Sequence, residues 1–373
     1  MKHTDDPSLE DHQLFPQREV VLSYLEHYAA GIAHLVHFHT QVVDCQSVAG
    51  GWSLTVKDLP TGRYSQKEYD AVVVATGHYS VPKVPDIKGL KAWDHANPGI
   101  ISHSKLYRSP KPYTDKKTII IGNAASGTDI ARHVATTARL PVLLSQRSEP
   151  PKQDEIDDQE LVPQIVEFVP PSQGCRAVRF ADGRVETDVE AIVFCTGYFF
   201  NYPFLSSLQP PVIESGERVK DVYQHLFSIH HPSLVFMGLP CKIIPFRTCE
   251  GQASVITAVW SGRLSLPLRS EMQSWDALRS KHLEPRAFHI LPAPKDLEYH
   301  NEMVDWASKA MNADQKRLPP KWGAKDFWLR DKIPMIRKQF AAQGRDRKNI
   351  RTLEDLGYDY TSWSKAQQGD RPS

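Results

Sequence analysis

Apolar residues recur at two different spacings in the first part of the chain. Between residues 17 and 33 they return every three or four positions, which predicts an amphipathic helix that ends at Gly31. Residues 36–48, 50–56 and 68–77 are short runs rich in Val and Thr, separated by turn residues. These runs predict a small antiparallel sheet that leads into a buried strand.

The middle and the end of the chain carry further patterns. Residues 116–148 are typical of a strand, a glycine-rich turn, a helix and a second strand, which together form a βαβ unit. The acidic, proline-containing stretch 148–175 predicts a loop or insertion, and residues 175–198 predict a hairpin followed by another buried strand. A helix is expected around residues 250–264. Beyond about residue 341 few large apolar side chains follow, which predicts a partly ordered tail.

Length and charge narrow the class of protein. At 373 residues the chain is long enough for two domains of ordinary size. Its 45 Lys and Arg residues nearly balance its 44 Asp and Glu residues, so no global positive field favours nucleic acid as a partner. No apolar run has the length of a membrane span, and the first residues lack the pattern of a signal peptide. We therefore expect a cytoplasmic protein.

The spacing of cysteine and histidine argues against several kinds of site. The five cysteines are an odd number, lie far apart and form no Cys-x-x-Cys pair. This pattern disfavours a disulfide scaffold, a zinc ribbon and a dithiol oxidoreductase. His37 and His39 are expected to share one face of a strand, but no third ligand follows at a matching spacing, so no metal site is predicted.

The turn of the βαβ unit has the form of a dinucleotide-binding fingerprint, with an ordinary strand-to-helix turn as the alternative interpretation. It follows the strand 118–121 and opens the helix 128–135, where free N–H groups at a helix start can hold a pyrophosphate. Gly122 allows the tight turn, and Gly127 allows helix and strand to approach closely. Ala124 stands where a second glycine is usual, and its methyl group moves the pyrophosphate slightly outward. The predicted contacts are Gly122, Asn123, Ala124, Ala125, Ser126 and Gly127.

The end of the second strand of this unit selects between the two nicotinamide cofactors. An acid there binds the ribose 2′-hydroxyl of NAD, whereas an arginine accommodates the 2′-phosphate of NADP. Here the strand runs into Ser145, Gln146 and Arg147, with Glu149 close by. This order favours NADP, and Ser145 and Arg147 are predicted contacts.

Two buried strands end in the same dipeptide. Thr76-Gly77 closes one strand before the fingerprint, and Thr196-Gly197 closes another after it. A strand that ends in Thr-Gly lets the chain turn away beside a bound nucleotide without a side chain in the path. The pair predicts an α/β fold with two nucleotide-binding domains, one inserted in the other.

In combination these motifs resemble the flavin-containing monooxygenase family, of the fungal type. The family pattern Phe-x-Gly-x3-His-x3-Tyr is met by Gly99, His103 and Tyr107, with Asn97 in the place of Phe. Later segments follow in the family's order, so the resemblance covers about residues 14 to 340. His103 is expected to support a junction between domains rather than to donate a proton.

The resemblance implies two nested Rossmann-like domains and two cofactors, FAD and NADPH. NADPH would reduce the flavin, oxygen would add to give a peroxyflavin, and a nitrogen or sulfur centre of a small molecule would take one oxygen atom. The resemblance also implies a role in secondary metabolite biosynthesis. No side chain is assigned as catalytic, and the FAD contacts carried over are Val42, Thr76, Gly77 and Gln252. The implied domains are a partial FAD-binding domain at 1–82, an NADPH-binding domain at 83–200, the remainder of the FAD-binding domain at 201–340 and a polar tail at 341–373.

The front of the chain departs from the family pattern. Members begin with their own Gly-x-Gly-x-x-Gly unit for the FAD pyrophosphate, and no such motif precedes residue 100 here. Relative to the pattern, at least one βαβ unit is expected to be missing, which leaves the FAD-binding domain incomplete at its N-terminal side. Two hypotheses follow: an active monooxygenase, or a flavin-deficient, non-catalytic NADPH-binding remnant. A related disulfide reductase would need a redox-active cysteine pair, which the sequence lacks.

Overall fold

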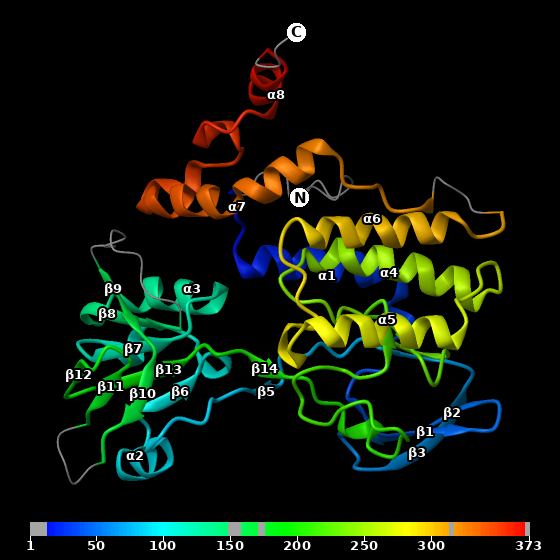
Figure 1. Ribbon diagram of the computed structural model, residues 1–373, viewed down its shortest axis with the longest axis horizontal. Helices are drawn as coiled ribbons and strands as arrows, with labels where there is room; N and C mark the ends of the chain where they lie inside the picture. Colours follow the sequence, from blue (N-terminus) through cyan, green and yellow to red (C-terminus); the bar gives the residue numbers. More distant parts are fainter. Residues whose placement is uncertain (1–12, 148–157, 171–175, 313–316, 370–373) are drawn as a thin grey trace. The chain divides into compact units, whose positions relative to one another are not determined.

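Two compact units make up the chain in the computed structural model (Figure 1). The described residues are 13–147, 158–170, 176–312 and 317–369. Unit 1 comprises Met1–Thr76, Pro203–Val212 and Lys220–Ser373, and unit 2 comprises Gly77–Tyr202 and Ile213–Val219. Along the sequence, unit 2 is therefore inserted within unit 1.

A five-stranded parallel sheet forms the centre of unit 2. Its strand order is β6-β13-β7-β8-β9, and every neighbouring pair runs parallel. The central strands are nearly continuous apolar runs, as expected for a parallel sheet that is covered on both faces. The strands are β6 (Ile101–His103), β7 (Lys117–Ile121), β8 (Arg139–Gln146), β9 (Gln159–Pro163) and β13 (Ala191–Phe194).

Different elements cover the two faces of this sheet. Helix α3 packs on one face, where its Val134 meets Ile120 of the sheet. On the other face the neighbouring residue Ile119 meets Phe180 of a small antiparallel sheet, because successive strand residues point to opposite faces. The covering elements are α3 (Ala125–Val134), α2 (Leu90–Ala96), β10 (Ile165–Phe168), β11 (Val178–Phe180) and β12 (Val185–Glu186).

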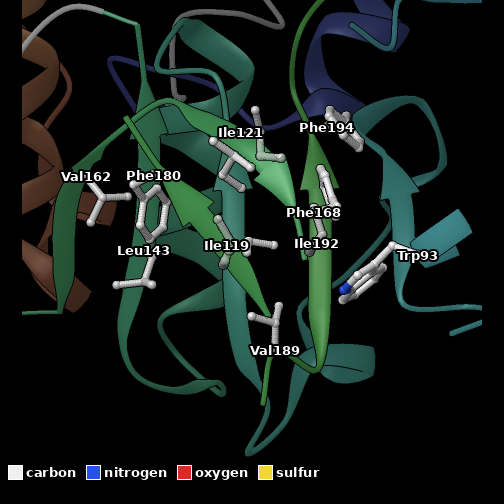
Figure 2. Close-up of a cluster of buried hydrophobic side chains, with 12 residues drawn as sticks. Trp93, Ile119, Ile121, Leu143, Val162, Phe168, Phe180, Val189, Ile192 and Phe194 are labelled. Atoms are coloured by element: carbon white, nitrogen blue, oxygen red, sulfur yellow. The ribbon is translucent and has the colours of Figure 1, made fainter. Parts of the chain in front are cut away.

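Figure 2 shows the core on the face opposite α3. Ile119 and Ile192 come from adjacent strands of the parallel sheet, and both are fully buried. Trp93 of α2 and Phe168 of β10 complete this core with their rings edge to face, centroids 5.4 Å apart. Burial of one such side chain stabilises a fold by about 1.5–3 kcal/mol. This core therefore fixes the covering elements to the sheet that carries the glycine-rich turn.

The prediction of a loop or insertion at 148–175 is wrong for those residues of the stretch that the structure describes. Residues 159–163 form β9, which extends the parallel sheet, and residues 165–168 form β10. Val162 and Phe168 are buried, so these strands contribute to the core in spite of the polar composition of the stretch. Positions 148–157 and 171–175 of the predicted loop lie outside the described residues. The hairpin that follows is confirmed, and its turn places Gly183 at a φ of 91°.

Unit 1 contains the predicted three-stranded antiparallel sheet and a second sheet of four short strands. In the second sheet β4 pairs in parallel with β17, so the antiparallel sheet does lead into a strand, but the predicted burial holds only in part: Val74 is buried, whereas Val73 is 42% exposed. The first sheet consists of β1 (Thr40–Val48), β2 (Gly51–Asp58) and β3 (Tyr64–Tyr69). The second, in spatial order, consists of β15 (Val222–Tyr223), β16 (Phe227–Ser228), β17 (Leu234–Phe236) and β4 (Val72–Val74).

Two predictions for the region before β1 need correction. Helix α1 (Arg18–Ala29) continues as the 3-10 helix η2 (Ala30–Leu35), so Gly31 does not end the helical segment. His37 and His39 lie in the turn ahead of β1 rather than on a strand face, and His39 has a φ of 53°. Within the part of the chain that the structure describes, no three His, Cys, Asp or Glu side chains come together as a metal site.

Helices form most of the second half of unit 1. The helix expected near residue 250 begins at Pro245, a residue that suits the first turn of a helix. The chain beyond residue 341 does not become the predicted tail in its described part, because it ends in further helices. None of the described helices is both long and apolar enough to cross a bilayer. The helices are α4 (Pro245–Trp260), α5 (Arg269–His282), α6 (Lys295–Ser308), α7 (Ala324–Ala342) and α8 (Tyr360–Gly369).

Short elements connect these parts. Strands β5 (Val81–Pro82) and β14 (Tyr198–Phe199) pair with each other in unit 2. The remaining 3-10 helices are η3 (Ser104–Leu106), η4 (Lys111–Tyr113), η6 (Pro203–Leu205), η7 (Pro285–Ala287), η9 (Gly344–Asn349) and η10 (Glu354–Leu356).

Two histidines form a hydrogen bond inside unit 1. The Nδ1 atoms of His225 and His289 lie 2.9 Å apart, and both side chains are about 1% exposed. One Nδ1 carries a proton and donates it to the other, which requires that the acceptor ring is neutral. Burial, together with the nearby His289 and Arg279, lowers the pKa of His225 well below 6.5.

We expect this histidine pair to make unit 1 sensitive to acid. Because the folded-state pKa of His225 is depressed, the unfolded chain binds the extra proton first. The contribution of neutral His225 to the free energy of unfolding is therefore complete above about pH 6.5. It decreases as the pH falls below this value, by up to about 1.4 kcal/mol per pH unit. Urea unfolding between about pH 5 and 7.5 measures this slope. His225→Asn, which tolerates the φ of 54° at this position, should flatten the slope, and parallel curves for the two proteins would contradict the assignment.

Candidate functional site

The glycine-rich turn between β7 and α3 is closely packed. Gly122 has a φ of 109°, a conformation that side chains other than glycine rarely adopt, and its N–H donates to the carbonyl of Ser145 at 2.8 Å. A Cβ added to Gly127 would lie 1.7 Å from the carbonyl oxygen of Gly122. Both glycines are therefore required by the backbone, as the fingerprint interpretation predicts.

The start of α3 leaves room for an anion. Ala124 is the N-cap residue with an extended backbone, and no side chain caps the first N–H groups of the helix. Asn123, Ala125 and Ser126 are exposed. Because uncapped N–H groups at a helix start and the helix dipole both favour negative charge, these residues fit the pyrophosphate of a dinucleotide. The helix begins three residues earlier than predicted, which places Ala125 and Ser126 in its first turn.

The end of β8 lies beside this turn. Ser145 is buried, and its hydroxyl donates to the carbonyl of Pro163 at 2.9 Å. Its side chain therefore links β8 to β9 within the sheet. Arg147 is exposed directly after the strand. Between them, Gln146 accepts a hydrogen bond through Oε1 from Asn123 Nδ2 at 2.6 Å. The prediction from sequence named the neighbours of Gln146 as contacts but not Gln146, although alternation along β8 turns it away from the buried face that Ser145 occupies.

The strand that ends in Thr196-Gly197 is anchored by several hydrogen bonds within unit 2. The Thr196 hydroxyl donates to the carbonyl of Lys83, and the N–H of Lys83 donates to the carbonyl of Gly197 at 2.9 Å. His103 Nε2 lies 3.1 Å from the same Gly197 oxygen, and His103 Nδ1 accepts from the N–H of Lys105. His103 is thus a neutral ring with its proton on Nε2, and burial lowers its pKa. These contacts support a structural role for His103.

Cys195 lies between this strand end and the fingerprint. Its carbonyl oxygen would be 2.6 Å from a Cβ added to Gly122, so the two segments are in close contact. Burial raises the pKa of its thiol to about 12, which keeps it protonated and unreactive at neutral pH.

The four residues carried over as FAD contacts occupy different settings. Val42 is half-buried in β1, where it pairs with Val56. Gln252 is fully buried in α4, where its Oε1 accepts from the N–H of Gly238 at 2.9 Å and its Nε2 donates to the Tyr299 hydroxyl at 2.9 Å. Its amide is therefore taken up by contacts within unit 1. Thr76 and Gly77 fall where unit 1 passes into unit 2 along the sequence. The assignment of these four residues as FAD contacts stays a prediction.

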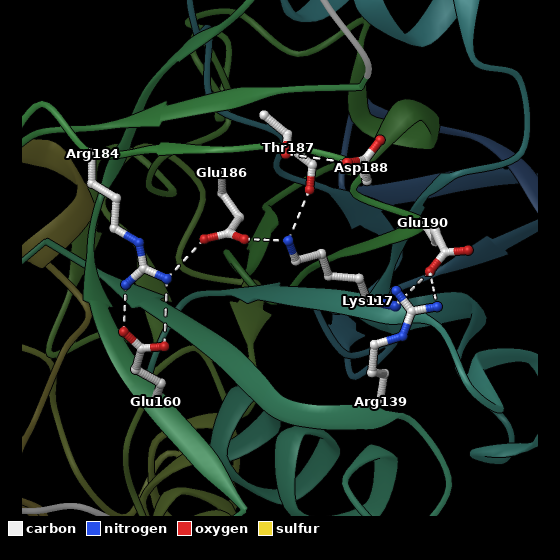
Figure 3. A network of polar contacts seen from close by, with 8 residues as sticks. All are labelled: Lys117, Arg139, Glu160, Arg184, Glu186, Thr187, Asp188 and Glu190. Carbon is white, nitrogen blue, oxygen red and sulfur yellow. Dashed lines mark hydrogen bonds and ion pairs between the residues drawn. The ribbon is translucent and has the colours of Figure 1, made fainter.

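Ion pairs concentrate at the opposite end of the parallel sheet (Figure 3). Arg139 at the start of β8 pairs with Glu190 at 3.1 Å, and Lys117 at the start of β7 pairs with Glu186. Arg184 bridges Glu186 and Glu160, at 2.7 Å from the former. Ligands of parallel α/β sheets bind at the carboxyl ends of the strands. This network at the amino ends is therefore structural, and the candidate site is the fingerprint end.

A parallel sheet covered on both faces, with a tightly packed glycine turn leading into an uncapped helix, defines unit 2 as a dinucleotide-binding domain of an α/β protein. The chain belongs to the flavin-binding monooxygenase-like family, whose profile matches residues 1–156 and 162–301. This confirms the resemblance drawn from the motifs and the α/β fold class. The family's description names a flavin and a monooxygenase, which makes an oxidoreductase that uses FAD and NADPH the function to be tested for this chain.

Several relatives are similar over most of this chain. The flavin-containing monooxygenase FMO GS-OX-like 2 of Arabidopsis thaliana is 32% identical over 309 residues, which cover 79% of this chain and 64% of the relative. The thiol-specific monooxygenase of Saccharomyces cerevisiae is 30% identical over 324 residues, covering 82% and 70%. The structure of S-allyl-L-cysteine S-oxygenase from Allium sativum superimposes with a TM-score of 0.76 at 29% identity, covering all of this chain and 80% of that protein. The matched stretches span 64%, 65% and 57% of the length of three relatives from Arabidopsis thaliana, which is less than two thirds of each.

Proposed function

We propose that this chain acts as an NADPH- and FAD-dependent monooxygenase that transfers one oxygen atom from O₂ to a sulfur or nitrogen centre of a small molecule. The observation that carries the proposal is the fingerprint turn, whose two glycines are fixed by packing and whose helix start is open to an anion. Sulfur is the favoured centre, because a thiol-specific monooxygenase and an S-oxygenase are among the similar proteins. A cytoplasmic setting and a place in secondary metabolism belong to the same proposal and rest on the sequence.

The residues of unit 2 have distinct tasks in this proposal. The turn Gly122–Gly127 and the first N–H groups of α3 hold the pyrophosphate of NADPH, and Arg147 meets its 2′-phosphate. The Gly197 carbonyl, held by His103 and Lys83, fixes the strand end beside the turn. When bound, NADPH supplies a hydride and the flavin supplies the reaction with oxygen. The chain's own part is to bind and orient, so we assign no side-chain nucleophile or acid.

The flavin-deficient hypothesis is the second candidate. It is supported by the buried Gln252 amide, whose oxygen and nitrogen are both hydrogen-bonded inside unit 1. In this case the chain binds NADPH without oxygenating a substrate.

One experiment separates the two candidates. The purified chain is mixed with excess FAD, desalted and examined by visible absorbance, and its oxygen consumption with NADPH is then followed with and without a small thioether. Retained flavin colour and thioether-dependent oxygen uptake are the expected results. Colourless protein that still binds NADP⁺ would support the flavin-deficient candidate. A chain that binds neither cofactor would contradict both.

A further inference from the structure

We propose that an exposed apolar stripe on unit 1 is the interface of a homodimer, in which two copies of this chain pair antiparallel about a two-fold axis. The inference goes beyond the proposed function and does not depend on it, because the stripe belongs to unit 1 and the dinucleotide site to unit 2. The stripe runs along α1 and η2 and ends just beyond them. Its members, called the α1 stripe below, are Leu22, Leu25, Tyr28, Ile32, Leu35, Val36 and Phe38.

Helix α1 and η2 are weakly held by the rest of the chain. Both lie wholly within the described residues, and neither contains a buried residue. One face of α1 carries the half-buried Val20, Val21 and Tyr24, and the Tyr24 ring lies 6.2 Å from that of Phe246 in α4. A helix of 12 residues is marginal in water on its own, because most helical stability in proteins comes from packing of an apolar face. A partner that covers the exposed face would therefore stabilise this segment.

The α1 stripe is continuous along the two elements. In α1, Leu22, Leu25 and Tyr28 are three residues apart, and residues at this spacing are neighbours on a helix surface. Ile32 follows four residues after Tyr28. In η2, Ile32 and Leu35 are again three residues apart, a spacing at which side chains eclipse in a 3-10 helix. The exposed fractions of these side chains show that no described segment of the chain covers the stripe.

The size of the stripe is that of an interface. Its members are between 38% and 72% exposed. The largest apolar patch on a typical monomer is about 300–600 Å², and seven large side chains exposed to this degree reach the upper end of that range. Two such patches face to face approach the roughly 1,200 Å² at which specific protein–protein interfaces begin. The stripe is therefore large enough to hold two copies of the chain together.

The charges beside the stripe favour the antiparallel orientation. The first half of the segment, α1, carries Arg18 against Glu19 and Glu26, whereas the second half, residues 30–39, carries His34 and His37 and no acid. Antiparallel pairing sets the acidic half of each copy opposite the histidines of the other, and an imidazole N–H can donate to a carboxylate. Parallel pairing would set carboxylate against carboxylate. A two-fold axis also closes the assembly with a single patch on each partner.

The antiparallel arrangement fixes which residues meet. Tyr28 lies six residues after Leu22 and seven before Leu35, at the middle of the stripe. The two-fold axis therefore passes near Tyr28, and the Tyr28 residues of the two copies face each other. The two Leu35 residues lie near opposite ends of the interface, about 20 Å apart at the helical rise of about 1.5 Å per residue.

Analytical ultracentrifugation of the full chain between about 1 and 100 µM measures the oligomeric state. We expect a dimer of twice 42.2 kDa. Leu25→Glu and Ile32→Glu each place a charge inside the stripe, and each should raise the dimer Kd by at least about tenfold. Leu278→Glu is the matched control, because Leu278 of α5 is 63% exposed and lies outside the stripe. It should dimerise as the wild type does.

Cysteine cross-linking tests the orientation. Under mild oxidation Tyr28→Cys should form a disulfide between two copies, which requires Cα atoms about 4.4–6.8 Å apart. Leu35→Cys, equally exposed but distant from its counterpart, should not cross-link. The wild type reports the background from the native cysteines. Cross-linking of both variants would indicate parallel pairing and would contradict the proposed interface.

The remaining outcomes also decide. A wild-type chain that stays monomeric at 100 µM overturns the proposal, and its cosedimentation with phosphatidylcholine vesicles would assign the stripe to a lipid surface instead. A dimer that persists unchanged in both Leu25→Glu and Ile32→Glu has another interface, which again overturns the proposal. If these variants lose helical circular dichroism, the Tyr28→Cys cross-link decides. Binding of NADP⁺ should be the same in every variant, so failure of the dimer leaves the proposed function untouched.

Discussion

Gly127→Ala should weaken the binding of NADP⁺ by at least about tenfold. The added methyl group would lie 1.7 Å from the carbonyl oxygen of Gly122 and 3.6 Å from Cβ of Cys195, so α3 and β7 must separate to admit it. Separation displaces the helix start that faces the pyrophosphate. We also expect the free energy of unfolding to fall by about 1–3 kcal/mol, as for other overpacked cores. Calorimetric titration and urea unfolding measure the two effects.

Gly31→Ala provides the control for this substitution. A Cβ at Gly31 meets nothing within 4 Å, and its φ lies outside the left-handed region. This variant should therefore bind NADP⁺ as the wild type does and should be equally or slightly more stable. Unchanged NADP⁺ affinity in Gly127→Ala would show that the fingerprint turn is not the dinucleotide site.

Arg330→Met is expected to lower the free energy of unfolding by about 3–5 kcal/mol, which is the usual cost of removing one partner of a buried ion pair. Arg330 Nε lies 2.7 Å from Oδ2 of Asp296, whose side chain is 1% exposed. Its guanidinium also donates to the carbonyl of Lys242 at 2.8 Å. The substitution leaves the Asp296 carboxylate without this cation and releases α7 from the start of α6. Urea unfolding at neutral pH measures the loss.

Two further variants show whether the loss comes from the unpaired carboxylate. In the double variant Asp296→Leu with Arg330→Met both charges are removed, so the loss should be smaller than in Arg330→Met alone. Asp331→Asn, which alters an exposed pair with Lys332, should change stability by less than about 0.5 kcal/mol. Equal losses for the single and double variants would mean that packing of Arg330, not its charge, holds α7.

Local sequence patterns account for much of unit 2. The β7-turn-α3-β8 segment could be predicted because its information lies within a short stretch, where glycine spacing and apolar periodicity act together. Strands β9 and β10 could not be predicted in the same way. Their apolar residues are interspersed with Gln159, Glu160 and Glu167, and their burial depends on neighbours that come from elsewhere in the chain.

The candidate site shows the same division between local and distant information. The two essential glycines were predicted from their spacing. The bond between Asn123 and Gln146 joins residues 23 positions apart, so no local pattern contains it. Gln252 was expected to contact flavin by resemblance, but its partners Gly238 and Tyr299 lie 14 and 47 positions away. A motif identifies the residue, whereas the fold decides which groups occupy its hydrogen-bonding atoms.

The short antiparallel pairing of β5 with β14 has a consequence for the history of the chain. Tyr198 pairs with Pro82, and Phe199 pairs with Val81. The chain segment between these two strands therefore begins and ends at neighbouring positions in space. A domain whose two ends meet in this way needs only two neighbouring points in a host chain, as a short hairpin would. Such a domain can be exchanged between proteins as a cassette, or joined end to end in a circular permutant, while its own sheet stays intact. A fragment for transplanting dinucleotide binding into another scaffold must also carry Ile213–Val219, which belong to unit 2 and accept a hydrogen bond from the Phe200 N–H through the Gly216 carbonyl at 2.7 Å.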